Sequence, residues 1–92
     1  MATSALDEIR RHLLESVKVV VDQPAAVRVE THETPALVVL LIAVAAEDVG
    51  RVVGKGGGRI RMLRDWARRR GAADGLMVHL DVVGSRGGRL ER

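Results

Sequence analysis

A glycine-rich, basic segment is the part of this chain best equipped for chemistry. Residues 54–57 read Gly-Lys-Gly-Gly; two valines precede them, and the pattern of an amphipathic helix follows them. A segment with so few side chains lets another backbone come close. A helix start adds unpaired N–H groups and the positive end of a dipole. These features favour an anion, and the sequence indicates a phosphate of a nucleic-acid strand.

Positive charge is concentrated around the same segment. Residues 51–70 carry eight basic side chains and one acidic side chain, a net charge of +7, whereas residues 1–50 carry four basic and eight acidic ones, a net charge of −4. A basic stripe beside a phosphate-accepting loop is typical of a nucleic-acid-binding surface. For the charge alone, a solvated arginine-rich helix face is the alternative explanation.

Other chemistry finds little support in the residue spacing. A dinucleotide fingerprint that begins at Gly54 would need a glycine at Arg59, and a Walker A loop would need serine or threonine at Gly56. The chain has no cysteine, its histidines lack the spacing of metal ligands, and neither Ser16 nor Ser85 has a general base beside it in the sequence. We therefore expect no enzymatic activity, no metal and no cofactor.

The spacing of apolar residues predicts the elements that must position the glycine segment. A three- to four-residue period indicates a helix, and alternation indicates a strand. The predicted order is α-β-β-α-α-β, over residues 5–20, 27–30, 36–45, 47–53, 58–70 and 76–83. A turn or loop is expected from Thr31 to Pro35, the strand at 36–45 is expected to be buried on both faces, and Gly71 is expected to end the second of the two later helices.

This order predicts an α+β fold in which a three-stranded sheet has helices packed on one face. We expect a single domain at residues 1–83, with its core at about 8–83, and a flexible basic tail at 84–92. The acidic start lacks the pattern of a signal peptide, and the longest apolar run is about half of the ~20 residues that a membrane span needs. A cytoplasmic location without membrane contact is expected.

The glycine segment and its flanks also carry a family resemblance. Residues 52–57 read Val-Val-Gly-Lys-Gly-Gly and are followed by the apolar Ile60, which resembles the Val/Ile-Ile-Gly-x-x-Gly signature of K-homology (KH) domains. The helix and strand ahead of the β-α-α-β unit are similar to the type II, bacterial arrangement. Residues 45–55 closely resemble the bacterial KhpA family of small RNA-binding proteins. Val53, where isoleucine is commoner, and Gly58, a third successive glycine, depart from the pattern.

The resemblance implies a single-stranded RNA-binding protein, an RNA chaperone or post-transcriptional regulator, that holds about four nucleotides through its GxxG loop. It also implies a KhpB (Jag)-like KH protein as partner in a heterodimer, or a homodimer. The candidate RNA-binding residues are the loop itself, the cations beside it and the aliphatic residues expected to line a groove for the bases: Gly54, Lys55, Gly56, Gly57, Arg51, Arg59, Arg61, Val49, Val52, Val53 and Ile60.

Two other interpretations stay open at the level of the sequence. One is a protein-interaction or dimerisation module in which nucleic acid, including single-stranded DNA, is secondary; the other is a ribosome-associated factor. The chain has one tryptophan and no phenylalanine or tyrosine, which disfavours folds that stack bases on several rings. Trp66 is expected to pack in or near the core, with base stacking among the arginines as the alternative.

Overall fold

The computed structural model describes residues 5–85 of the chain. Its helices and strands follow one another as α1 (Ala5–Lys18), β1 (Arg28–Glu33), β2 (Val38–Ala45), α2 (Val49–Val53), α3 (Gly58–Ala72) and β3 (Val78–Ser85). Short 3-10 turns lie at Pro24–Ala26, Ala46–Asp48 and Lys55–Gly57. The α-β-β-α-α-β order predicted from the sequence is confirmed.

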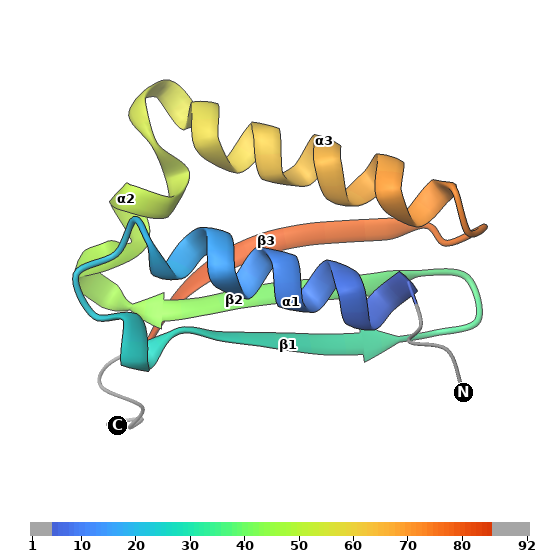
Figure 1. Ribbon diagram of the computed structural model, residues 1–92, viewed down its shortest axis with the longest axis horizontal. Coiled ribbons are helices and arrows are strands. Elements are labelled where there is room, and N and C mark those ends of the chain that lie inside the picture. Colours follow the sequence, from blue (N-terminus) through green and yellow to red (C-terminus); the bar gives the residue numbers. More distant parts are fainter. Residues whose placement is uncertain (1–4, 86–92) are drawn as a thin grey trace.

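The three strands form one mixed sheet in the order β1-β2-β3. β1 and β2 are antiparallel, with Val29 opposite Ile42, whereas β2 and β3 are parallel, with Leu40 opposite Leu80. Parallel neighbours need a crossover connection, and the α2–α3 pair supplies it. Figure 1 shows α1 and α3 on the same face of the sheet, as predicted.

The core lies between this helical layer and the sheet. Ile9, Leu13 and Val17 recur every four residues on α1, so that they face the sheet together and have almost no exposed surface. Alternate residues of β2 meet them from below: Val38, Leu40, Ile42 and Val44. The apolar residues recur with a regular period in the sequence because they all pack into one continuous core layer.

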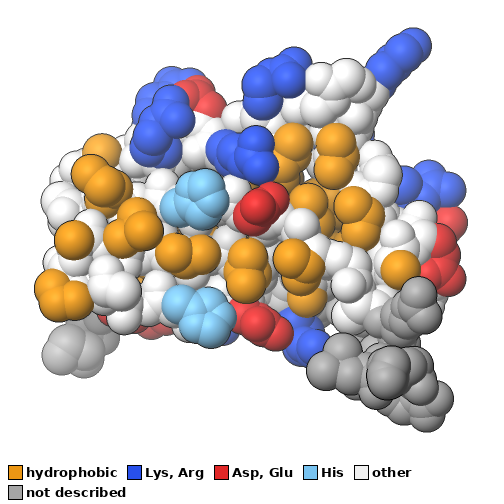
Figure 2. All heavy atoms as spheres, turned by 180° about the vertical axis from the view of Figure 1, so that it is seen from behind, with side chains coloured by type: hydrophobic (Ala, Val, Ile, Leu, Met, Phe, Trp, Pro, Cys, Tyr) orange, Lys and Arg blue, Asp and Glu red, His pale blue; other side chains and the backbone are white. Residues whose placement is uncertain are grey.

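The opposite face of β2 is only partly covered: Ala43 and Ala45 are buried near the end of the strand, but the expectation that the whole strand is buried on both faces is wrong. Val39 and Leu41 belong to that face and are half-buried, and Val83 of β3 is exposed. Figure 2 shows this side of the molecule, where hydrophobic side chains gather across the middle. Within residues 5–85 no helix lies over it, because α1 and α3 both pack on the other face.

The expected turn from Thr31 to Pro35 is partly wrong. β1 continues through Glu33, and His32 lies opposite Val39 in the antiparallel ladder. Pairing with β2 keeps the chain extended through residues 31–33. The turn begins at Thr34, whose Oγ1 accepts hydrogen bonds from the N–H groups of Ala36 (3.3 Å) and Leu37 (3.0 Å).

The end of α3 also differs from the prediction. Gly71 lies inside the last turn of the helix rather than after it, and a Cβ built there would lie 2.5 Å from Val78 Cγ2. Gly71 therefore allows α3 to approach β3, and Gly75, with φ at +77°, makes the turn.

β3 begins at Val78 and extends through Ser85, two residues into the range expected to be a tail. The rest of that tail, 86–92, lies outside the described residues. Within the described part of the chain, no helix has both the length and the apolar composition that crossing a bilayer requires.

Candidate nucleic-acid interface

The connection between α2 and α3 has a backbone that only this pattern of glycines accommodates easily. Gly54, Gly56 and Gly57 have φ values of +79°, +63° and +78°. Lys55 is the one residue of the four without a positive φ, and no other residue type in the described chain has one. The glycines of the motif are therefore needed for conformation as well as for close approach.

Gly54 is the most constrained of these positions. A Cβ built on it would lie 2.8 Å from Arg59 Cβ and 2.9 Å from Arg59 N, closer than real Cβ contacts. Its φ and ψ, +79° and 169°, belong to a region that is almost restricted to glycine. Its N–H donates to the Gly50 carbonyl (2.9 Å), and its carbonyl accepts from the Gly57 N–H (3.0 Å), so Gly54 connects the two helices rigidly.

We expect Gly54→Ala to destabilise the protein by about 3 kcal/mol, because strain and overlap add. Gly58 is the matched control: it has helical φ and ψ of −65° and −41°, and nothing lies within 4 Å of a Cβ built there. Gly58→Ala should stabilise by about 0.5 to 1 kcal/mol. Urea unfolding followed by circular dichroism measures both values, and equal midpoints for the two variants would contradict this description of the loop.

The loop is open to solvent. Lys55 and Gly56 are exposed, and Gly54 and Gly57 are partly exposed. Figure 1 shows the α2–α3 connection projecting beyond the sheet at one end of the helical layer. No part of residues 5–85 covers the loop, so an extended strand can reach its backbone.

The structure divides the basic residues of the 51–70 block into paired and unpaired ones. Arg64 pairs with Asp81 (3.2 Å), and Arg70 pairs with Asp74 (3.1 Å) and also with Glu8. Arg68 and Arg69 share one carboxylate, that of Asp65, and the Arg69 hydrogen bond lowers the pKa of Asp65. Within the 51–70 block, three cations pair with no acidic side chain of the described residues: Lys55, Arg59 and Arg61. The cations of this block that lack an acidic partner therefore lie at or beside the glycine loop.

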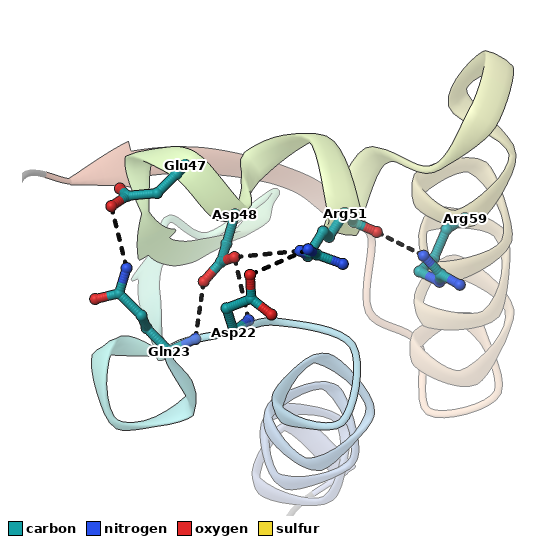
Figure 3. Close-up of polar contacts among 6 residues, drawn as sticks. All are labelled: Asp22, Gln23, Glu47, Asp48, Arg51 and Arg59. Atoms are coloured by element: carbon teal, nitrogen blue, oxygen red, sulfur yellow. Dashed lines mark hydrogen bonds and ion pairs between the residues drawn. The ribbon is translucent and has the colours of Figure 1, made fainter.

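Arg51 behaves differently from the other predicted RNA-binding cations. Its guanidinium lies 3.0 Å from an Asp22 carboxylate oxygen and 3.6 Å from Asp48 (Figure 3). Two carboxylates therefore offset its charge. The contacts tie α2 to the segment after α1, which makes Arg51 the least available of the predicted cations.

Arg59 and Arg61 are held beside the loop by neutral partners. Arg59 donates to the main-chain carbonyl of Arg51 (Figure 3), and Arg61 donates to the Gly56 carbonyl at 3.0 Å. Bonds to carbonyls leave the positive charge uncompensated. Each guanidinium also has further donors, which suit phosphate oxygens.

A buried carboxylate beneath α2 was not recognised from the sequence. Asp48 is 1% exposed and accepts from the backbone N–H groups of Asp22 (3.1 Å) and Gln23 (3.0 Å), as Figure 3 shows. The sequence predicted a helix from residue 47, but α2 begins at Val49, and Asp48 makes no side-chain capping bond to it. Asp48 instead anchors the α1–β1 connection under the helix that leads into the glycine loop.

The predicted aliphatic residues split into two groups. Val52 has no exposed surface and Ile60 is 5% exposed, because both belong to the core. Val52 therefore offers no surface to a base, and Ile60 offers almost none. Their side chains support the loop from below. Val49 and Val53 are half-buried and remain accessible on the side of α2.

β3 forms one outer edge of the sheet, and its main chain bonds to side chains of α3 and of β3 itself. Arg64 Nε donates to the Leu80 carbonyl (3.0 Å), and Asp81 Oδ1 accepts from both Arg64 (3.2 Å) and the N–H of Val82 (2.9 Å). On the other edge of the sheet, Arg10 donates to the Val29 carbonyl of β1 (3.3 Å). Main-chain groups at both edges are therefore bonded to side chains.

Two comparisons with known proteins agree with this geometry. A family model described as "KhpA/KhpB, KH domain" matches residues 10–87. A relative named "RNA-binding protein KhpA", from Leifsonia xyli subsp. xyli (strain CTCB07), is 41% identical over 71 residues, which cover 77% of this chain and 91% of that protein. The matched region includes the whole of the α2–loop–α3 unit.

Proposed function

Because the chain belongs to the KhpA/KhpB family of KH domains, we propose that it binds single-stranded RNA through the GxxG loop at residues 54–57. The observation that carries this proposal is the coincidence of an exposed, side-chain-poor backbone with the three cations of the 51–70 block that pair with no acidic side chain of the described residues. A role as an RNA chaperone or post-transcriptional regulator in the bacterial cytoplasm, alone or paired with a KhpB-like KH protein, is part of the same proposal.

The physical mechanism rests on phosphate contact at a bare backbone. A sugar–phosphate strand approaches Gly54, Gly56 and Gly57 without meeting side chains, and the N-terminus of α3 favours its negative charge. Lys55 binds as a mobile point charge, whereas Arg59 and Arg61 extend the contact on either side of the loop. Bases then lie toward Val49 and Val53. Such contacts fix the strand without selecting a sequence.

The difference between unpaired and paired arginines on α3 gives a test of the proposal. Arg61→Gln removes a cation without an acidic partner, so we expect it to weaken RNA binding about fivefold, as the loss of about 1 kcal/mol would. It should also flatten the slope of log affinity against log salt by about 0.7. Arg68→Gln removes a cation that pairs with Asp65 and should leave both quantities nearly unchanged. Fluorescence anisotropy with a labelled RNA octamer over a range of salt concentrations measures them.

Equal losses of RNA affinity in the two variants would mean that the overall positive charge of α3, and not contact at the glycine loop, determines binding. No binding by the wild-type protein would favour the other candidate, a protein-interaction module. The observation behind that candidate is the uncovered sheet face with Val39, Leu41 and Val83 (Figure 2).

A further inference from the structure

A shallow cavity of about 700 Å³ lies between α1 and α3. Residues from both helices line it, among them His12, Ser16, Arg59, Met62 and Trp66. The Trp66 and His12 rings stack, with centroids 4.2 Å apart and planes at 27°. The cavity therefore has an aromatic platform built from two helices.

The core buries only part of this platform. Trp66 packs against the core, as expected from the sequence, yet it stays partly exposed. Met62, one turn before it on the same side of α3, is 68% exposed. An apolar, ring-bearing surface left open to water beside arginines suits a flat ligand that carries negative charge, and a nucleotide combines a base with a phosphate.

The charge around the cavity supports the same class of ligand. Three arginines and one aspartate line it: Arg59, Arg69, Arg70 and Asp65. Asp65 is bound by Arg68 and Arg69, so it presents no free negative charge to an incoming phosphate. Arg70 is in turn offset by Glu8 and Asp74, so the lining cation without an acidic partner is Arg59, which is the one available to a phosphate.

Arg59 also connects the cavity with the glycine loop. Its backbone packs against Gly54, its guanidinium bonds to the Arg51 carbonyl, and it lines the cavity. Trp66 follows seven residues later on α3, about 10 Å along the helix axis, which roughly three stacked nucleotides span. One strand can therefore bind at the loop and at the platform together.

We propose that the α1–α3 cavity is a second RNA subsite, in which a base of the strand held by the GxxG loop stacks on the indole of Trp66. The inference rests on the proposed RNA binding and extends it beyond the loop. A peptide with acidic side chains matches the arginines but makes no use of the ring platform, so we choose RNA as the ligand. Stacking of this kind tolerates any base, because every base has a π-face.

Trp66 is the only tryptophan and the chain has no tyrosine, so intrinsic fluorescence reports on this cavity alone. We expect an adenylate octamer to quench the fluorescence and an adenylate tetramer, which the loop alone can hold, to quench it much less. Trp66→Leu should weaken octamer binding about tenfold, measured by anisotropy, with little effect on the tetramer. Circular dichroism checks the fold of the variant. Met62→Glu, an exposed change at the cavity, should have the same selective effect if Trp66→Leu proves unstable.

The outcomes separate this inference from the proposed function. If the octamer binds without quenching, and Trp66→Leu and Met62→Glu bind it as the wild type does, the subsite is overturned while binding at the loop stands. If wild-type protein binds neither oligonucleotide, the proposed function fails and the subsite with it. Equal quenching by an octamer of glutamate would overturn the choice of RNA as the ligand.

Discussion

The Lys55→Asp, Gly56→Asp double variant is expected to lose RNA affinity by about 100-fold or more. Together the two changes alter the charge of the loop by three units. At about 1 kcal/mol for each unit close to a phosphate, they cost about 3 kcal/mol of binding free energy. The acidic side chains also occupy the space through which the sugar–phosphate backbone approaches. Anisotropy titrations at low and moderate salt measure the loss.

We expect this variant to keep its fold, with a modest loss of stability from the positive φ at Gly56. Lys55 is exposed, and nothing lies within 4 Å of a Cβ built on Gly56. The φ and ψ of Gly56, +63° and 17°, lie in the left-handed region that aspartate tolerates better than most residues. A double variant that remains folded by circular dichroism and binds RNA as tightly as the wild type would refute binding through the GxxG loop.

The second large effect concerns stability and is expected for Asp48→Ala. The substitution leaves the backbone N–H groups of Asp22 and Gln23 without their acceptor in a part-buried position, and it removes one of the two carboxylates facing Arg51. We expect a loss of about 3 kcal/mol in the free energy of unfolding. For a domain of this size, such a loss lowers Tm by roughly 15 °C.

Glu47→Ala is the matched control for the Asp48 prediction. Glu47 is the adjacent acidic residue, but it is exposed, and it accepts a hydrogen bond from the Gln23 side chain at 3.2 Å. Its loss should change stability by less than about 0.5 kcal/mol. Thermal unfolding of the two variants separates a buried anchor from acidic charge near a helix start. Similar melting temperatures would show that the Asp48 hydrogen bonds contribute little.

The order of elements could be predicted from the sequence because each long element buries one face. The four-residue repeat on α1 and the aliphatic run of β2 both reflect contact with the same core, so local pattern and tertiary structure agree. The glycine loop could also be predicted, because a backbone with positive φ values strongly favours glycine. The exposure and φ values of residues 54–57 now add a conformational reason for each glycine.

What escaped prediction depends on contacts between residues far apart in the chain. Asp48 binds main-chain N–H groups 25 and 26 residues away. Because almost every residue has a main-chain N–H group, the residue types do not reveal which ones will bind Asp48. The orientation of α2 and α3 decides that Val52 and Ile60 face the core rather than a groove. Of the ion pairs on α3, those with Asp65 follow helical spacing and could be read locally, whereas the pair of Arg70 with Glu8 could not.

The arginines at the two sheet margins have a consequence for how the protein behaves at high concentration. A three-stranded sheet has two outer strands, and unpaired main-chain groups on such strands invite another chain to add to the sheet. Arg10 and Arg64 bind carbonyls of Val29 and Leu80 on these strands, and Asp81 binds the Val82 N–H. A neighbouring molecule must displace these bonds before it can pair with an edge strand. These bonds therefore disfavour edge-to-edge association of the sheet, even though one of its broad faces is open.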